Sequence, residues 1–512
     1  MKGKYGRIIL VFPPLILISL FINQPCFAES GSHRLHAQDL VYQGAFAFPE
    51  GDEWTYSGQA LAYYPHGHAS GPADGYPGSL YTAGHAWNDL VGEITIPVPV
   101  ISHDFSKLPK ASVLRSPTDI TGGWKDNCTF SEGCLYRELD GLEYLPNINK
   151  IVWNLRDWYN VAAFDQDSLG WSDPDMTNAR GVWHIGKRSD PEFHNARTCN
   201  YLFKAPVGFA TKYLDGKRLI AGNHREAGAL DGSQGPTLYA LAPWEDGNPP
   251  ASGQNLDALA LVYYPEIYDC VWGDPDLCHF PDYRAKDDWG GGAWVQMEDK
   301  SAILIFGRKG LGESCYGTQQ ECSGDPCDPY KGYHAYPYEP QILFYDQEEL
   351  KEVVAGTRAP WEVLPYEVYR PVSEVFDPGC GIFGAVAYDS ERRLIYVTEQ
   401  TAGPWDETVV HVWKIDAQDA VSILYVDSND QTCGGNSPCY TSIQEGIDHA
   451  NEGAIIRITQ GAYGESIVLN QSKTLEVTGG WNSGFTAQSG DTSIKSITIG
   501  NGTVTMDNMV IE

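Results

Sequence analysis

The chain has 512 residues, of which 67 are acidic and 35 basic, so its net charge at pH 7 is −32. A surface this acidic repels the phosphates of nucleic acids and anionic lipids, which excludes nucleic acid as a partner. It also repels acidic polysaccharides unless calcium bridges the two, or a local basic pocket intervenes, so Ca²⁺ is the one cofactor that the composition suggests.

Residues 1–28 have the pattern of a signal peptide. Three basic residues precede the apolar run IILVFPPLILISLFI, and the segment ends at Cys26–Ala28 with a small-x-Ala cleavage site. The run is shorter than the ~20 residues of a spanning helix and contains two prolines. Asn23–Pro25 lacks the pattern that precedes a lipid-modified cysteine. We therefore expect a secreted, periplasmic or cell-surface protein without membrane insertion after cleavage, which takes the net charge from −32 to −35.

Cleavage would leave eleven of the 12 cysteines, an odd number, in an oxidising compartment. Three pairs are close enough in sequence to close small loops: Cys128/Cys134, Cys270/Cys278 and Cys433/Cys439. We predict disulfides at the first and third, whose loops are short and polar. Three more cysteines crowd one insertion, Cys315, Cys322 and Cys327. Their spacings do not match a zinc ribbon or finger, so disulfides are favoured over zinc. One thiol should stay free or pair between chains.

An apolar hairpin recurs five times. In each copy a strand, a short polar turn and a second strand starting with Leu or Ile follow one another, at 59–85, 141–157, 209–225, 293–309 and 385–400. The copies are roughly 70 to 90 residues apart, which leaves room for insertions. Because a strand pair cannot bury its faces alone, we predict an all-β fold, a five-repeat β-propeller over residues 29–422.

The segments around the hairpins complete the predicted blades. A first strand at 39–49 should close the ring by pairing near the last blade. Further strands are expected at 91–101, 160–165, 182–186, 236–243, 340–346 and 409–416. Long loops are expected at 102–138, 166–181, 245–290 and 310–339, where function usually lies. The clearest helix in this region is 346–356.

Beyond residue 420 aromatic residues become rare and short β-like runs recur at closer spacing. They follow the segment TSIQEGIDHANEG, an amphipathic helix with Ile443, Ile447 and Ala450 on one side. With the segments CYTSIQEGI, QGAYGE and TGGW, this part resembles the opening rungs of the pectin-lyase-like superfamily. The resemblance implies a short right-handed parallel β-helix-like module at 423–512, of the kind attached to varied secreted bacterial proteins. The later rungs that carry catalytic residues in longer members are missing, so none is transferred.

Residues 29–422 resemble, in general character only, secreted bacterial propeller-like domains of unassigned function. Within this part the repeat places polar residues in register, because the ends of all second strands should gather on one rim. Counting five residues from the first aliphatic residue of each second strand gives His85, Arg156, His224, Arg308 and Glu399. Their neighbours complete the candidate ligand-binding rim: Asp140, Asp157, Arg225 and Trp289. The arginines and histidines predict a locally cationic rim that suits a carboxylate-bearing ligand.

Other interpretations of the rim remain open. Polar residues belong at solvated strand ends in any case, and Arg156 with Asp157 would form an ordinary surface ion pair. His85, His224 and Glu399 could bind a metal ion, although two nearby arginines disfavour a cation. Asp140 and Glu399 could be the two carboxylates of a glycosidase.

The function predicted from the sequence is that of a secreted or surface-associated binding protein whose ligand is a glycan or a cell-envelope component. The 15 Trp and 30 Tyr residues could stack on sugar rings, or they could fill the space between blades. A propeller glycosidase or polysaccharide lyase is the first alternative, and a structural envelope protein is the second.

Overall fold

The computed structural model places most of the chain after residue 32. It describes residues 33–67, 75–126, 137–157, 166–224, 232–242, 249–265, 267–272, 275–297, 300–322, 324–416, 423–450, 453–471 and 473–512. The predicted signal peptide at 1–28 lies outside these ranges. The chain separates into two compact units, His33–Gln418 and Asp419–Glu512, which are considered separately below.

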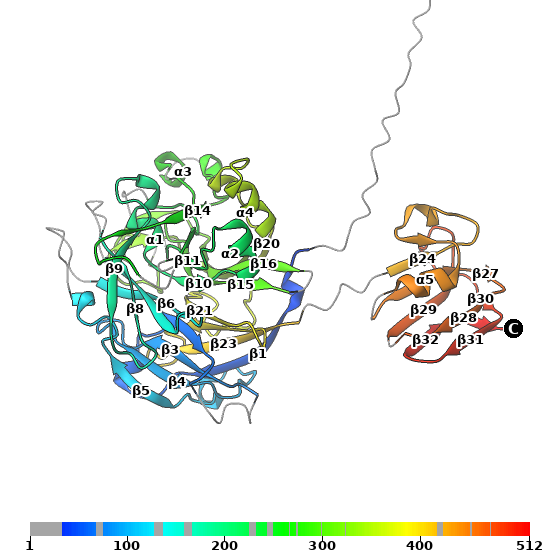
Figure 1. The fold of residues 1–512 in the computed structure, drawn as a ribbon, viewed down its shortest axis with the longest axis horizontal. Helices are drawn as coiled ribbons and strands as arrows, with labels where there is room; N and C mark the ends of the chain where they lie inside the picture. Colours follow the sequence, from blue (N-terminus) through cyan, green and yellow to red (C-terminus); the bar gives the residue numbers. More distant parts are fainter. Residues whose placement is uncertain are drawn as a thin grey trace, which may run out of the picture. The chain divides into compact units, whose positions relative to one another are not determined.

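The first unit is built around five sheets of four or five strands each, numbered here as blades 1 to 5 (Figure 1). Blade 1 contains β2 (Leu61–Tyr64), β3 (Ser79–Ala83), β4 (Val91–Thr95) and β5 (Val113–Thr118). Blade 2 contains β6 (Arg137–Leu145), β7 (Lys150–Asp157), β8 (Leu169–Ser172), β9 (Arg180–Ile185) and β13 (Asn255–Leu256). Blade 3 contains β10 (Leu202–Lys204), β11 (Leu219–Ala221), β12 (Leu238–Leu241) and β14 (Ala258–Val262). Their strands pair antiparallel, apart from the parallel pair β9 and β13.

Blades 4 and 5 complete the ring. Blade 4 contains β15 (Asp288–Gln296), β16 (Ser301–Gly310), β19 (Tyr338–Tyr345) and β20 (Glu367–Tyr369). Blade 5 contains β21 (Phe383–Asp389), β22 (Leu394–Glu399), β23 (Val409–Ile415) and, from the start of the unit, β1 (Leu40–Ala47). β1 pairs antiparallel with β23, so the first strand closes the ring with the last blade, as predicted.

The first strand of each blade lies next to the axis. β2 contacts β6 and β21, β10 contacts β6 and β15, and β15 contacts β21, so these five strands form a closed circle. This arrangement confirms the predicted five-blade propeller. Fully buried aromatic side chains fill the space between the sheets, among them Trp153, Trp183, Trp289 and Trp413.

Glycines allow the inner strands to approach one another at the axis. A Cβ on Gly290 of blade 4 would overlap the carbonyl oxygen of Gly384 in blade 5, and a Cβ on Gly384 would overlap that of Gly58. In blade 2 a Cβ on Gly141 would overlap the carbonyl oxygen of Asn200. Strand glycines commonly mark such close backbone approaches. The glycine run 290–292 before the fourth hairpin therefore allows close packing of the inner strand of blade 4.

The third predicted hairpin is wrong in its first half. Residues 209–213 belong to helix α2 (Val207–Tyr213), and the inner strand of blade 3 is the earlier β10. Phe209, Ala210 and Leu214 are buried, a spacing that suits one face of a helix as well as a short strand. Short apolar runs are ambiguous in this way, and the packing on the blade decides between the two structures.

Several predicted loops contain regular structure. β8 lies within 166–181, while the predicted strand at 160–165 lies outside the described residues. The insertion 310–339 holds the two-stranded sheet β17 (Cys315–Gly317) and β18 (Gly332–His334). Besides α2, the described residues of this unit contain three α-helices: α1 (Asn195–Thr198), α3 (Tyr268–Trp272) and α4 (Gln347–Val354). The last confirms the helix predicted at 346–356. No helix of the described residues is long and apolar enough to cross a bilayer.

Four disulfides are present in the described residues: Cys270–Cys278, Cys315–Cys322, Cys327–Cys380 and Cys433–Cys439. They confirm the prediction for Cys433–Cys439 and the preference for disulfides over zinc in the insertion. Cys327–Cys380 ties this insertion of blade 4 to the segment before β21. Cys199 is buried and belongs to none of the four. The predicted pair Cys128–Cys134 lies outside the described residues.

The C-terminal unit is built of parallel strands. One sheet contains β24 (Ile423–Val426), β25 (Cys439–Tyr440), β26 (Ile455–Thr459), β29 (Thr474–Trp481) and β32 (Thr503–Asp507). Two smaller sheets contain β27 (Gly461–Ala462), β30 (Thr492–Ile494) and β33 (Met509–Ile511), and β28 (Ser466–Leu469) with β31 (Ser496–Ile499). All of these ladders are parallel. Helix α5 (Ile443–His449) buries Ile443 and Ile447 in the core, which confirms the predicted amphipathic helix.

Candidate functional site

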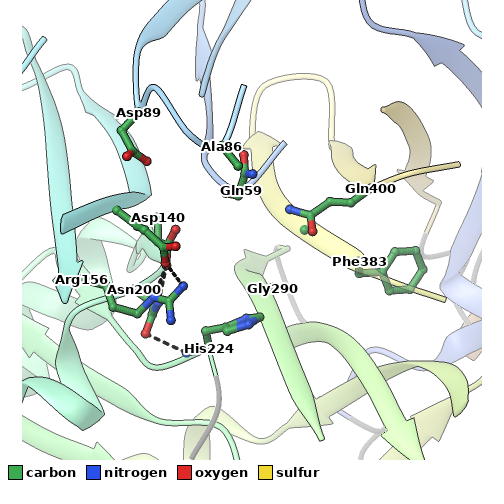
Figure 2. Close-up of a pocket in the computed structure, with 12 residues that line it drawn as sticks. Gln59, Ala86, Asp89, Asp140, Arg156, Asn200, His224, Gly290, Phe383 and Gln400 are labelled. Atoms are coloured by element: carbon green, nitrogen blue, oxygen red, sulfur yellow. Dashed lines mark hydrogen bonds and ion pairs between the residues drawn. The ribbon is translucent and has the colours of Figure 1, made fainter. Parts of the chain in front are cut away.

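A pocket opens at one end of the propeller axis and receives residues from all five blades (Figure 2). Its volume is about 150 Å³. The lining consists of Gln59, Ala86 and Asp89 from blade 1, Glu138, Asp140 and Arg156 from blade 2, Asn200 and His224 from blade 3, Gly290 from blade 4, and Phe383, Gly384 and Gln400 from blade 5. Because every blade contributes, only the closed ring produces this pocket.

A β-bulge brings Asp140 to the axis. Along β6, Leu139 pairs with Leu155 and Gly141 pairs with Asn154, so Asp140 is an extra residue on its strand. β15 has the same irregularity, which makes Gly290 its extra residue. Bulges bend a strand and redirect side chains, and they are frequent next to active sites. Of these two axial bulges, the one in blade 2 presents a carboxylate and the one in blade 4 presents bare backbone.

Asp140 is held by two donors on the same oxygen. Its Oδ2 accepts hydrogen bonds from Arg156 Nε at 2.5 Å and from Asn200 Nδ2 at 2.8 Å. Arg156 also forms an ion pair with Glu138. Burial opposes the charge of Arg156, but Asp140 and Glu138 outweigh this effect and raise the pKa of the guanidinium above its usual value. Asn200 in turn accepts a hydrogen bond from the backbone N–H of His224 at 3.0 Å.

Asp89 lies beside this network in a different environment. It follows β3, is 8% exposed, and its Oδ1 accepts a hydrogen bond from Leu139 N at 3.1 Å. Burial raises its pKa from 3.8 to about 7, and the charges of Asp140 and Glu138 add to the effect, whereas the Leu139 N–H and Lys125 oppose it. Asp89 is therefore a carboxyl group that keeps its proton up to about pH 7.

The structure brings together three of the residues predicted from the repeat. Asp140, Arg156 and His224 line the pocket, and His85 stands beside it, next to Ala86. Asp157 ends β7, but its side chain lies outside the described set, as does Arg225. Counting five residues along the second strand therefore identifies a pocket residue in blade 2, Arg156, and in blade 3, His224. The carbonyl oxygen of His224 also accepts a hydrogen bond from the backbone N–H of Trp289 at 2.6 Å.

Arg308, Trp289 and Glu399 lie elsewhere, buried within or between blades. Arg308 is paired with Asp288 at 2.8 Å and lies over the ring of Tyr338. Trp289 is 1% exposed and packs in the core. Glu399 is fully buried, where it accepts hydrogen bonds from the backbone N–H groups of Phe376 and Asp377 and lies 2.7 Å from His411 Nε2. All three stabilise the fold.

The expected pairing of Asp140 with Glu399 as glycosidase carboxylates is therefore corrected. In blade 5 it is Gln400, one residue further along, that reaches the pocket. Side chains alternate along a strand, so a register error of one residue exchanges its two faces. The irregular pairing of β21 with β22 between Phe383 and Val386 makes the register in this blade hard to predict.

The expected charge of the rim is also corrected. The pocket holds three carboxyl groups, on Asp89, Glu138 and Asp140, against one arginine and one histidine. It is therefore not a cationic patch. Among the residues that the structure describes, no group of three or more His, Cys, Asp or Glu side chains is arranged to hold a metal ion. The metal site suggested for His85, His224 and Glu399 is therefore not formed, since Glu399 is buried beside His411.

The repeat does not predict the remaining polar residues of the pocket. Asn200 was missed because the inner strand of blade 3 was placed too late in the chain. Gln59 follows Gly58 just before β2, and Asp140 lies beside Gly141 in β6, so a polar residue next to glycine near an inner strand would have been the useful signal. Asp89 lies in a loop, where the repeat gives no register.

Exposed aromatic side chains are carried by loops that adjoin the pocket. Trp87 and Trp405 are 80% and 78% exposed, and Tyr56 is 47% exposed. The carbonyl oxygen of Tyr56 accepts hydrogen bonds from Gln59 Nε2 at 2.7 Å and from Ala86 N at 3.1 Å, so Tyr56 is bonded to two residues of the pocket. The backbone N–H of Tyr56 donates to Asp406 O, which joins the loop of Trp405 to the same place.

The ring of His85 connects two of these exposed aromatic side chains. His85 lies between Tyr56 and Trp87, with ring centroids 5.6 Å and 5.4 Å away. We call the three exposed side chains, Tyr56, Trp87 and Trp405, the aromatic rim. No protein-family model and no curated protein matches the sequence. The chemistry of the pocket and of the aromatic rim is therefore the basis of the proposed function.

Proposed function

We propose that this protein binds a glycan at the end of the propeller axis, with a terminal sugar in the axial pocket and the adjoining sugars over the aromatic rim. The observation that carries the proposal is the combination of planar hydrogen-bonding side chains inside the pocket with exposed aromatic rings beside it. Sugar hydroxyls both donate and accept hydrogen bonds, while the C–H faces of the sugar ring pack on aromatic surfaces.

Two amides are available to a ligand. Gln59 Oε1 is buried and has no hydrogen-bond partner among the described residues, although it lines the pocket. A buried acceptor without a partner costs about 1–3 kcal/mol, which a ligand donor would recover. The side chain of Gln400 lies across the pocket from Asp140 (Figure 2), and no hydrogen bond of this side chain is found among the described residues. The amides of Gln59 and Gln400 together offer a ligand hydrogen-bond donors and acceptors.

The charge of the pocket selects the class of sugar. Arg156 is already neutralised by Asp140 and Glu138, so it has little capacity left for a carboxylate on a ligand. Uronic acids and other anionic sugars would be repelled by the same carboxylates. The proposed ligand is therefore a neutral sugar or an amino sugar, and the earlier expectation of a carboxylate-bearing ligand is abandoned.

We further propose that the chain is exported and that residues 423–512 form the start of a pectin-lyase-like right-handed β-helix. The disulfides support an oxidising compartment. Parallel ladders in three sheets, with α5 before them, support the second interpretation, because a β-helix is built of stacked parallel strands. In this proposal the module accompanies the binding propeller and adds no catalytic residue.

A glycan array followed by calorimetry on the protein lacking residues 1–28 tests the binding proposal. We expect neutral or amino-sugar oligosaccharides to bind. Trp87→Ala and Trp405→Ala should each weaken binding about 2- to 10-fold, since an aromatic contact contributes ~0.5–1.5 kcal/mol. Asn200→Ala should also weaken binding, because it removes a polar side chain that lines the pocket. Tyr268→Ala is the matched control, because Tyr268 is 68% exposed in α3, outside the rim. Exclusive binding of anionic glycans, or equal binding by all variants, would contradict the proposal.

A further inference from the structure

We infer that the axial pocket hydrolyses the glycan placed in it, with Asp89 as the general acid and Asp140 as the general base. This inference rests on the proposed glycan ligand and adds an activity to it. It also replaces the carboxylate pair expected from the sequence, because Glu399 is buried away from the pocket.

The fold holds the two carboxyl groups in one cavity from neighbouring blades. Asp89 comes from the loop between β3 and β4 of blade 1, and Asp140 from the bulge in β6 of blade 2. Leu139 N donates to Asp89 Oδ1, so the residue next to Asp140 anchors Asp89 directly. Figure 2 shows both groups on the same side of the pocket, with the open volume next to them. Both groups therefore line the volume in which a bound sugar would lie.

The surroundings of the two groups differ. Asp89 is buried, receives one backbone hydrogen bond, and faces the negative charges of Asp140 and Glu138 and the positive charge of Lys125 from the short helix Trp124–Asp126. Its pKa is raised to about 7, so it can keep a proton to donate. Asp140 instead accepts two hydrogen bonds, one from a guanidinium, which suits a carboxylate. Unequal surroundings for two carboxyl groups are the usual basis of an acid–base pair.

The proposed step is a hydrolysis that consumes one water molecule. The O–H of Asp89 gives its proton to the bridging oxygen while the bond from that oxygen to the anomeric carbon breaks, and the leaving sugar departs as an alcohol. A water oxygen bonds to the anomeric carbon and passes its proton to Asp140. Both hydrogen bonds that Asp140 accepts from described residues end on Oδ2, which leaves Oδ1 to take this proton. Exchange with solvent then returns a proton to Asp89 and removes one from Asp140.

The test uses cello-, xylo- and chito-oligosaccharides together with the corresponding p-nitrophenyl glycosides. The nitrophenolate leaves without help from an acid, so the two kinds of substrate separate the two roles. Asp89→Asn should lower cleavage of the oligosaccharides about 10²–10⁴-fold and cleavage of the nitrophenyl glycosides far less. Asp140→Asn should lower both. Asp215→Asn is the control, because Asp215 is exposed in the turn after α2 and its left-handed backbone accepts Asn.

Binding measured by calorimetry on the same variants separates this inference from the proposed function. If the wild type binds an oligosaccharide but releases no reducing ends from it, the inference is wrong and the binding function stands. If no probe binds, the proposed function and this inference are both wrong.

The pH profile of the wild type is a second test, and it does not depend on the folding of a variant. With the wild type, kcat/KM on an oligosaccharide should fall above a pH near 7, as Asp89 loses its proton, and a rate that stays constant to pH 9 would overturn the assignment.

Discussion

Replacing Asp89 by Asn should stabilise the propeller at alkaline pH and leave it nearly unchanged at acid pH. In the unfolded chain Asp89 ionises near pH 3.8, whereas in the folded protein it keeps its proton until about pH 7. Unfolding therefore releases a proton between these values, so the folded state loses stability as the pH rises from about 4 to 7 and remains at the lower level above it. Asn carries no charge, so it does not incur this loss.

The size of the effect follows from the two pKa values. At 1.36 kcal/mol per pKa unit, the change from 3.8 to about 7 corresponds to at most about 4 kcal/mol above pH 7. An unfolding entropy of about 2.1 cal/mol/K per residue over roughly 400 residues converts this into about 5 °C of Tm. Asn can still accept the hydrogen bond of Leu139 N, and it tolerates the left-handed backbone at position 89, where φ is 48°.

Differential scanning calorimetry of the wild type and Asp89→Asn between pH 4 and pH 9 measures this difference. The Tm of the variant should exceed that of the wild type at pH 8–9, and the gap should close towards pH 4. Asp215→Asn serves again as the control and should show no gap that depends on pH. A gap that is constant with pH, or a variant less stable than the wild type at pH 8, would show that Asp89 is charged in the folded protein and refute the reasoning.

Two further substitutions test the packing around the site. Arg308→Ala should destabilise the propeller by ~3–5 kcal/mol, because it leaves the buried carboxylate of Asp288 without its guanidinium. Chemical denaturation measures this loss, and an unchanged midpoint would indicate that Arg308 lies at a solvated rim. Gly290→Ala should prevent the ring from closing, because its Cβ would overlap the carbonyl oxygen of Gly384. Gly332→Ala is the control and should fold and melt like the wild type, because no atom lies within 4 Å of an added Cβ there. Equal yields and melting curves for the two variants would contradict the close approach of the strands at the axis.

Local patterns were enough to predict the blades but only part of the site. Four of the five hairpins lie where their turns and apolar strands placed them, because hairpin turns are determined by nearby residues. The pairing of β1 with the last blade followed from the need to close the ring. The third hairpin failed at 209–213, since tertiary packing decides whether so short an apolar segment forms a helix or a strand.

The errors at the site have a common cause in backbone irregularity. Counting along a strand assumes a regular ladder, and the inner strands of blades 2, 4 and 5 are bulged near the axis. The count runs along the second strands, and on β7 it still reached Arg156, next to the bulge of β6. It selected Glu399 where Gln400 reaches the pocket. It could not find Asp89 at all, because that residue depends on a loop conformation with positive φ.

The same axis explains why the charged side chains of the pocket gather on one side. Blades 4 and 5 meet through Gly290 and Gly384, so closely that no side chain fits between these two residues, and the lining that these blades contribute, Gly290, Phe383, Gly384 and Gln400, carries no charge. On the opposite side the bulge of β6 projects Asp140, and Asn200 of blade 3 fills the space left by Gly141. Glycine therefore closes the ring where the strands touch, and the charged residues occupy the part of the circle that glycine leaves open. Changes of the polar side chains could alter the ligand without opening the ring, whereas changes of the glycines would remove the pocket together with the fold.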